Sequence, residues 1–279
     1  MGLSVWGLDN MVNDLDLVSV IMGTYNCEKT IGCAIESILK QTYRNFEFII
    51  CDDGSTDDTL SIIKAYAEKD TRITVLYNEC NMRLAASLNR CLHVARGKYI
   101  ARMDADDESL PTRLEIQIDF LEKHPEYDVV GCNRIIFDGN GNHGVRKSIE
   151  FPNKNVLIKD TPFAHPTIMM KKRVYDVLGG YRDSKATMRA EDLDLWFRFY
   201  EKSFQGYNLQ QVLYRYHESY ADYTKRSLKA GVQTARVFWN GYKRIHVPYY
   251  KRIWALKPII SSLVPNWIMR YYHLTKIRS

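Results

Sequence analysis

The sequence predicts an α/β fold in which helices flank a mostly parallel central sheet. Short apolar runs rich in β-branched residues alternate with stretches of helical periodicity. Three polar clusters follow these runs: GTYN after the first, DDGSTDD after the second and DADD after the fourth. Because the carboxyl ends of parallel strands meet at one edge of a sheet, we expect the clusters to converge on a single ligand site.

The alternation of elements supports each part of this fold. Strands are expected where the chain is briefly apolar, at 17–22, 46–53, 73–77, 98–103 and 127–137. Helices are expected where apolar residues recur at helical spacing, at 31–39, 55–69 and 84–92, the last of them ended by Gly97. Thr112 and Glu115 have the spacing of a capping box and predict a further helix after Pro111. Residues 138–144 form a turn, and antiparallel pieces are expected from there to about 200.

Composition limits the class of protein. Of the 279 residues, 46% are hydrophobic and 26% are charged, which is typical of a globular chain. No run of eighteen apolar residues occurs, so no transmembrane helix is expected. The N-terminal extension 1–16 contains acids but no basic region, so no secretory signal is expected. The six cysteines include no C-x-x-C pair, and several lie in apolar stretches, which predicts buried, reduced thiols in a cytoplasmic protein.

The charge is unevenly distributed along the chain. Residues 220–279 contain twelve Lys or Arg and one acidic residue, which leaves −5 of the overall net charge of +6 for residues 1–219. Aromatic residues accompany the basic ones, and prolines divide the segment into short helices. This C-terminal helical extension is expected to lie on an anionic membrane surface. A solvated appendage packed on the body, or a dimer contact, is the alternative; a nucleic-acid partner is not expected.

The segment YIARMDADDESLP carries the first chemical signal. Asp104 and Asp106 are two residues apart at the end of an expected strand, where both carboxylates can face one point. Hard oxygen ligands with spare coordination positions suit Mg²⁺ or Mn²⁺, with phosphate oxygens completing the shell. Taken alone, the same pattern could be a solvated acidic turn.

Five blocks in a fixed order resolve that ambiguity: VSVIMGTYN, FEFIICDDGSTDDT, GKYIARMDADDESLPTRLE, HPTIMMKKRVYDVLGGY and AEDLDLWFRF. Together they resemble the inverting glycosyltransferases of family 2, which have the GT-A fold, over residues 17–219. The resemblance implies a nucleotide-binding half at 17–107 and an acceptor-binding half at 108–219. It also implies a nucleotide-sugar donor, with a UDP-sugar favoured, and a divalent metal on the donor diphosphate.

The resemblance assigns nucleotide contacts to several positions. Asp53 is expected to accept the N3–H of uracil, which a carboxylate can do, although an Asx turn or helix cap is the alternative. Arg83 is expected on the base or diphosphate, and Asp104 on donor sugar or ribose hydroxyls. The remaining contacts fall on the end of the first strand, at Gly23, Tyr25, Asn26 and Glu28.

The resemblance also assigns the metal and the reaction. Asp106 is the expected metal ligand, Asp107 supports it, and His217 is placed on the metal or diphosphate. Asp192 is the expected general base that takes the proton of an acceptor hydroxyl. Sugar contacts are assigned to Glu191, Trp196, Gly179, Gly180 and His165. For Trp196 a core role, for the glycines a tight turn and for the histidines a structural role are the alternatives, and Asp194 is expected to be structural.

The predicted function is transfer of a sugar to a glycan or lipid-linked saccharide in bacterial surface polysaccharide synthesis, at the inner face of the cell membrane. Two rival functions remain. A nucleotidyltransferase would also bind a nucleotide beside a metal, but the GTYNCEKT segment lacks the glycine- and basic-rich phosphate loop such enzymes carry. A non-catalytic glycan- or membrane-binding protein could keep the fold, but the set Asp53, Asp104, Asp106 and Asp192 argues against lost activity.

Overall fold

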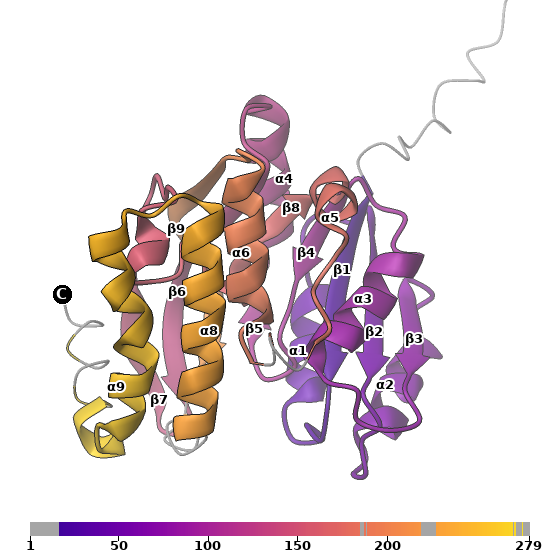
Figure 1. Ribbon diagram of the computed structural model, residues 1–279. Helices are drawn as coiled ribbons and strands as arrows, with labels where there is room; N and C mark the ends of the chain where they lie inside the picture. The colour runs from indigo at the N-terminus through magenta and orange to yellow at the C-terminus, as the bar shows by residue number, and fades with distance from the viewer. Residues whose placement is uncertain are drawn as a thin grey trace, which may run out of the picture.

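The computed structural model describes residues 17–184, 187, 189–218, 227–269, 271 and 275, so the expected extension 1–16 lies outside it. The strands within these ranges are β1 Val18–Thr24, β2 Phe46–Asp52, β3 Ile73–Tyr77, β4 Tyr99–Arg102, β5 Glu108–Ser109, β6 Val129–Asp138, β7 Gly141–Arg146, β8 Met169–Lys171 and β9 Gly206–His217. They form one nine-stranded sheet in the order β3-β2-β1-β4-β8-β6-β9-β5, with β7 paired to β6 (Figure 1).

The sheet is mostly parallel, as the sequence predicts. Strands β1 to β4 run parallel, and β6 runs parallel to β9. The short β8 lies antiparallel between β4 and β6 and joins the two parallel groups. The ends of β1 and β2 meet in register at Thr24 and Asp52, and the Asp53 N–H donates to the Thr24 carbonyl at 2.8 Å. The first two polar clusters therefore lie side by side.

Helices cover both faces of this sheet. They are α1 Ile31–Leu39, α2 Thr59–Ala67, α3 Leu84–Val94, α4 Arg113–Lys123, α5 Lys172–Leu178, α6 Glu191–Glu201, α8 Leu228–Arg244 and α9 Lys257–Leu263, with short 3₁₀ turns η2 Val156–Ile158, η3 His165–Thr167 and η4 Tyr249–Leu256. One buried core contains apolar residues of α1, α2 and α4. The other contains those of α3, α5, α6 and α8. Because the central strands are buried on both faces, they are continuously apolar rather than alternating.

Four local predictions are wrong. The turn expected at 138–144 is confined to residues 139–140, because β7 begins at Gly141 and pairs with β6. Helix α2 begins at Thr59 instead of residue 55, because Asp57 Oδ1 accepts both the Thr59 N–H at 3.1 Å and its hydroxyl at 2.6 Å and so holds a turn there. The capping box does not form, since Glu115 accepts the Thr42 hydroxyl at 2.6 Å. Gly97 does not end α3 but lets the chain pass β1, where a Cβ would lie 2.6 Å from the Leu17 carbonyl.

The described part of the C-terminal segment belongs to the body of the molecule. Figure 1 shows α8 standing beside α6, and α9 beside α8 on the side away from α6. The Phe197 ring of α6 meets Phe238 at 5.9 Å and Tyr242 at 5.8 Å between centroids. The Tyr242 hydroxyl donates to the Ile158 carbonyl at 2.7 Å. Helix α8 therefore fixes α6 from outside, which is the packed appendage left open as an alternative.

Two further expectations can be compared with the structure. All six cysteines are unpaired as expected, but Cys33 and Cys80 are exposed. Within the described ranges, no helix combines the length and the apolar character needed to cross a membrane.

The contact between α6 and α8 predicts the effect of Gly241→Ala. In a helix, alanine is favoured over glycine by about 1 kcal/mol. Here, however, a Cβ would lie 2.2 Å from the Phe197 ring, and overpacking costs typically 1–3 kcal/mol. We therefore expect a net loss of unfolding free energy, measured by chemical denaturation. Gly139→Ala is the control, because nothing lies within 4 Å of that Cβ. A Gly241→Ala protein more stable than wild type would contradict this packing.

Candidate active site

A cavity of about 230 Å³ opens where β1 and β2 end. Its walls come from the ends of these strands, the start of α3 and the segment that leads into α6. Of the residues that the sequence assigned to the nucleotide or sugar, Gly23, Tyr25, Asp53, Arg83 and Glu191 line it. The polar ends of the strands and the start of α6 thus meet at one hollow.

Asp53 organises the floor of this cavity. It is 3% exposed. Its Oδ1 accepts from Asn78 Nδ2 at 2.6 Å and from the Met82 N–H at 2.9 Å, and its Oδ2 accepts from the Arg83 N–H at 2.6 Å. These bonds shape the loop before α3, so Asp53 does not close the Asx turn of its own segment. The neighbouring Asp52 makes that turn by accepting the Ser55 N–H at 3.0 Å.

Asn26 and Glu28 lie beside the cavity without lining it. Asn26 Oδ1 accepts the Thr56 N–H at 2.9 Å, and Glu28 Oε2 accepts the Asp58 N–H at 3.2 Å. Both side chains therefore tie the loop after β1 to the loop after β2. Their assignment to the nucleotide stays a prediction.

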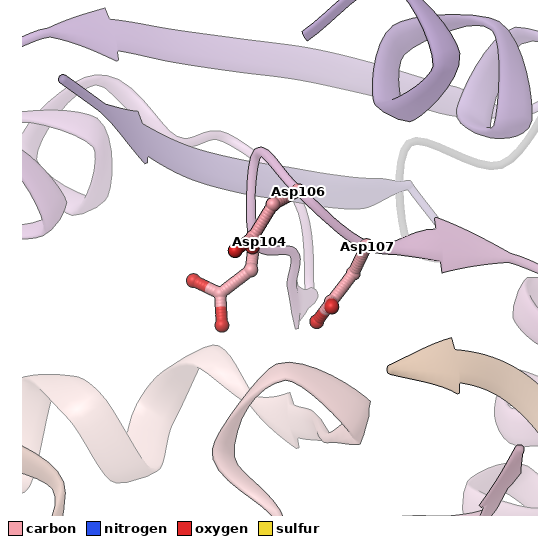
Figure 2. A group of neighbouring side chains, drawn as sticks. All are labelled: Asp104, Asp106 and Asp107. Carbon is pink, nitrogen blue, oxygen red and sulfur yellow. The ribbon is translucent and has the colours of Figure 1, made fainter. Parts of the chain in front are cut away.

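The acidic loop follows β4, and Figure 2 shows Asp104, Asp106 and Asp107 projecting from it. One carboxylate oxygen from each lies within 4.8 Å of the others. Asp104 forms an ion pair with Arg102, whose side chain is 3% exposed. Burial alone would lower the pKa of Arg102, but Asp104 outweighs it and keeps that pKa above its ordinary value. A buried positive charge therefore anchors one side of the loop.

The other side of the loop suits a divalent cation. Burial, followed by the charge of Asp104, raises the pKa of both Asp106 and Asp107. Asp107 Oδ1 accepts the His217 N–H at 2.7 Å, and His217 Nδ1 lies 3.6 Å from Asp106 Oδ2. Asp107 Oδ2 and His217 Nδ1 are buried and have no hydrogen-bond partner among the described residues. Uncompensated carboxylates beside a free imidazole nitrogen form a donor set that fits Mn²⁺ or Mg²⁺.

Asp192 and Glu191 stand at the start of α6. Asp192 Oδ1 accepts the Leu193 N–H at 2.7 Å. Burial raises the pKa of Asp192, and burial followed by the charge of Asp192 raises that of Glu191. The charge of Asp104 acts on both groups in the same direction, so the start of α6 and the acidic loop belong to one electrostatic site. A carboxylate with a raised pKa is a stronger base than a solvated one.

Trp196 is a core residue, and its assignment to sugar stacking is wrong. Its side chain is 0% exposed. The indole packs against Phe163 at 4.8 Å and Phe199 at 5.8 Å between ring centroids. The helix turns the face that carries Trp196 toward the sheet, so the ring offers no surface to a ligand.

Gly179 and Gly180 end α5 instead of lining the cavity. Gly179 has φ +69° and donates to the Asp176 carbonyl at 3.3 Å, while Gly180 donates to Tyr175 at 2.9 Å. A left-handed glycine followed by such a bond is a common helix terminus. This is the tight turn left open as the alternative, and the assignment of these glycines to the donor sugar stays a prediction. The residues that follow them, Arg182, Asp183 and Ser184, reach the cavity.

His165 is also placed beneath the site rather than in it. It is 8% exposed, and its Nε2 lies 2.7 Å from the Tyr181 hydroxyl, which lies 3.0 Å from that of Tyr175. Burial lowers the pKa of His165 well below its ordinary value, so the ring is neutral at pH 7. Its predicted sugar contact is therefore replaced by a hydrogen bond that holds Tyr181.

Several site residues have no counterpart in the sequence interpretation. Arg182 and Arg189 line the cavity. Arg113, which is fully buried, donates to the carbonyls of Arg102 at 2.8 Å and Ile168 at 3.1 Å. An arginine inside the apolar run YIARM is the one signal that could have identified Arg102. Asp194 is structural as expected, since it pairs with Arg198 at 2.7 Å.

Comparison with known proteins identifies the family. Residues 19–179 match the family described as glycosyl transferase family 2. Because the match spans more than half of the chain, the protein belongs to this family, and the resemblance drawn from the ordered motifs is confirmed.

Two curated relatives cover most of the chain. The protein EpsE of Bacillus subtilis (strain 168), named as a glycosyltransferase, is 47% identical over 261 residues, which are 93% of this chain and 94% of EpsE. WfaP of Escherichia coli is 35% identical over 206 residues, which are 73% of this chain and 78% of WfaP. WfaP is named as a UDP-Glc:α-D-GlcNAc-diphosphoundecaprenol β-1,3-glucosyltransferase.

Two solved structures share the fold. TarS residues 1–349 of S. aureus, in complex with UDP, gives a TM-score of 0.65 at 22% identity, covering 87% of this chain and 70% of TarS. The mannosyltransferase PcManGT of Pyrobaculum calidifontis, in complex with GDP-Man and Mn²⁺, gives a TM-score of 0.63 at 20% identity, covering 92% of this chain and 79% of PcManGT. These likenesses confirm the predicted GT-A fold.

Proposed function

We propose that this family 2 glycosyltransferase is a metal-dependent, inverting enzyme of surface polysaccharide synthesis. It transfers a hexose or N-acetylhexosamine from a UDP-sugar to a hydroxyl of a lipid-linked saccharide. The observation that carries the proposal is the meeting of three features at one edge of the sheet. These are the cavity floored by Asp53, the acidic loop with its free ligand atoms, and Asp192 with its raised pKa.

The donor half of the proposal rests on the cavity. Tyr25 is 47% exposed at the cavity and offers a ring face to a base. Asp53 keeps one lone pair, on Oδ2, beyond its three hydrogen bonds, so it can still accept the N3–H of a uracil. The cationic side chains of Arg83, Arg182 and Arg189 suit phosphate oxygens. Asp106, Asp107 and His217 would hold a divalent cation, which supplies charge neutralisation for the departing diphosphate.

The transfer itself rests on Asp192. The acceptor oxygen forms its bond to the anomeric carbon while the bond from that carbon to the diphosphate breaks, and the electron pair leaves with the diphosphate. The proton of the acceptor hydroxyl passes to the Asp192 carboxylate. Since attack comes from the side opposite the leaving group, the anomeric configuration inverts. Glu191, at the cavity wall one residue earlier, is positioned to bind a sugar hydroxyl.

The acceptor is proposed to be membrane-linked, and the surface of η4 and α9 supports this. Exposed apolar residues crowd this short segment: Tyr249, Tyr250, Ile253, Leu256, Ile260 and Leu263. Lys251, Arg252 and Lys257 accompany them. Aromatic and basic residues together suit an anionic bilayer surface, where each basic residue contributes about 1 kcal/mol. We propose peripheral association at the inner face of the cell membrane.

Nucleotide titration tests the donor and the metal. We expect UDP to bind in the presence of Mn²⁺ more tightly than GDP or dTDP, in calorimetric titrations with and without the metal. Asp106→Ala should abolish the gain from Mn²⁺, because it removes the main metal ligand. Asp119→Ala, exposed on α4, is the control. If none of these nucleotides binds, the chain is a glycan- or membrane-binding protein that keeps the fold.

Asp192→Asn tests the base. We expect normal UDP binding and a loss of transfer of about 100-fold or more, since removal of a general base typically costs this much. Glu201→Gln, at the far end of the same helix, should keep full activity. In the wild type, transfer should fall as the pH falls through an apparent pKa above the ordinary aspartate value of about 3.9, because protonated Asp192 accepts no proton. Retained transfer in Asp192→Asn would move the base to Glu191.

Vesicle binding tests the membrane surface. The double variant Tyr250→Ser/Ile253→Ser should bind vesicles of phosphatidylglycerol more weakly than wild type, with unchanged UDP binding. Phe151→Ser removes a ring that is 62% exposed outside the C-terminal segment and is the matched control. Added salt should weaken wild-type binding, because it screens charge. Equal vesicle binding by all three proteins would refute membrane docking through η4 and α9.

A further inference from the structure

A second cavity, of about 240 Å³, lies between the hairpin formed by β6 and β7 and the loop before η3. Its charged lining residues are Arg134, Arg146, Lys147 and Asp160. Lining hydroxyl donors are available from Ser148 and Thr161. Three cationic side chains therefore face one carboxylate, and no role has been assigned to this cavity above.

The two arginines are incompletely satisfied. The Nε atoms of Arg134 and Arg146 are buried and have no hydrogen-bond partner among the described residues. Arg146 pairs with Glu218 at 2.8 Å, whereas Arg134 donates to the Ser148 hydroxyl at 3.4 Å. Burial, followed by the charge of Arg146, lowers the pKa of Arg134. An anion bound between two guanidinium groups that repel each other in a partly buried cavity would stabilise both of them electrostatically.

The cavity and the acidic loop lie along the same face of β9. Alternate residues of a strand share a face, so Tyr214, Tyr216 and Glu218 form one row. At one end the Tyr214 hydroxyl accepts the Asp104 N–H at 3.3 Å, and at the other Glu218 pairs with Arg146. Between them the Arg134 guanidinium lies 5.7 Å from the centre of the Tyr216 ring. Four residues of extended chain span about 13 Å, which separates the cavity from the acidic loop.

We propose, on the basis of the transferase function above, that the Arg134–Arg146 cavity binds the phosphate or diphosphate group of the acceptor. Oxyanions of this kind accept paired N–H donors from arginine, which the two guanidiniums supply. The donor diphosphate belongs to the other cavity, beyond the acidic loop. Each anionic group therefore has its own set of arginines.

The experiment uses inorganic pyrophosphate as the probe, titrated calorimetrically into the full chain in the presence of a chelator. Without divalent metal the acidic loop repels the probe, so we expect saturable binding at the Arg134–Arg146 cavity. Arg134→Gln should weaken this binding at least tenfold, and Arg134→Lys should weaken it less because the charge remains. Lys147→Glu reverses a charge on an exposed lining residue and should also weaken binding. If Arg134→Gln does not fold, Lys147→Glu provides the test, because it lies on the surface.

Two controls distinguish pyrophosphate binding at the Arg134–Arg146 cavity from binding at the donor cavity and from binding to bilayer phosphates. Arg182→Gln removes a cation of the donor cavity and should leave pyrophosphate binding unchanged. Vesicles of phosphatidylglycerol should bind Arg134→Gln as well as wild type, because the proposed ligand is the acceptor and not the bilayer. Mn²⁺-dependent UDP binding by Arg134→Gln reports separately on the proposed function.

The proposal is overturned if wild type does not bind pyrophosphate, or if Arg134→Gln and Lys147→Glu bind it as wild type does. A loss confined to Arg182→Gln would place the probe in the donor cavity, which also overturns the proposal. Parallel loss of vesicle and pyrophosphate binding in Arg134→Gln would assign the cavity to bilayer phosphates instead. Intact UDP binding alongside any of these results would leave the transferase function standing.

Discussion

Repulsion among carboxylates at the carboxyl edge of the sheet is the constraint on which the site depends. Asp104, Asp106 and Asp107 crowd one loop, and Glu191 and Asp192 face it from α6. The protein neutralises part of this charge internally, through Arg102 against Asp104. The rest is left uncompensated, as the raised pKa values of Asp106 and Asp107 show. Binding of a cation would lower the electrostatic free energy of such a site. Without a cation, the fold holds the carboxylates together at a cost in stability.

The elements around the loop supply the rigidity that this repulsion requires. Arg113 connects α4 to β4 and to the strand-like segment before β8 through two main-chain carbonyls. On the other side, α8 presses on α6 through Phe238 and Tyr242. The position of Asp192 therefore depends on a helix more than thirty residues later in the chain. One part of the basic C-terminal segment packs against α6, and another part, η4 and α9, carries an exposed apolar surface.

The fold was predictable because its signals are local. Apolar runs, helical periodicity and polar strand ends each occupy a few consecutive residues, and parallel topology brings the strand ends together without further information. The errors concern side chains whose contacts come from segments distant in the sequence. Glu115 has the spacing of a capping box, yet it accepts the Thr42 hydroxyl from another segment at 2.6 Å. Trp196 shares a helix with Asp192, yet its ring is buried against Phe163 and Phe199.

The sequence by itself determined the fold class, the family and the acidic and basic residues that can carry its chemistry. Ordered motifs and their spacing can be seen along the chain without knowledge of its folded structure. Only the tertiary structure decided which of those residues face a cavity. It buried Trp196 and His165, placed Asp53 and Glu191 at the cavity where β1 and β2 end, and brought Arg182 and Arg189 to the same cavity. It also placed Arg134 beside Arg146 across a hairpin. Burial and charge pairing depend on contacts between residues that are distant in the sequence, so they exist only once the chain has packed.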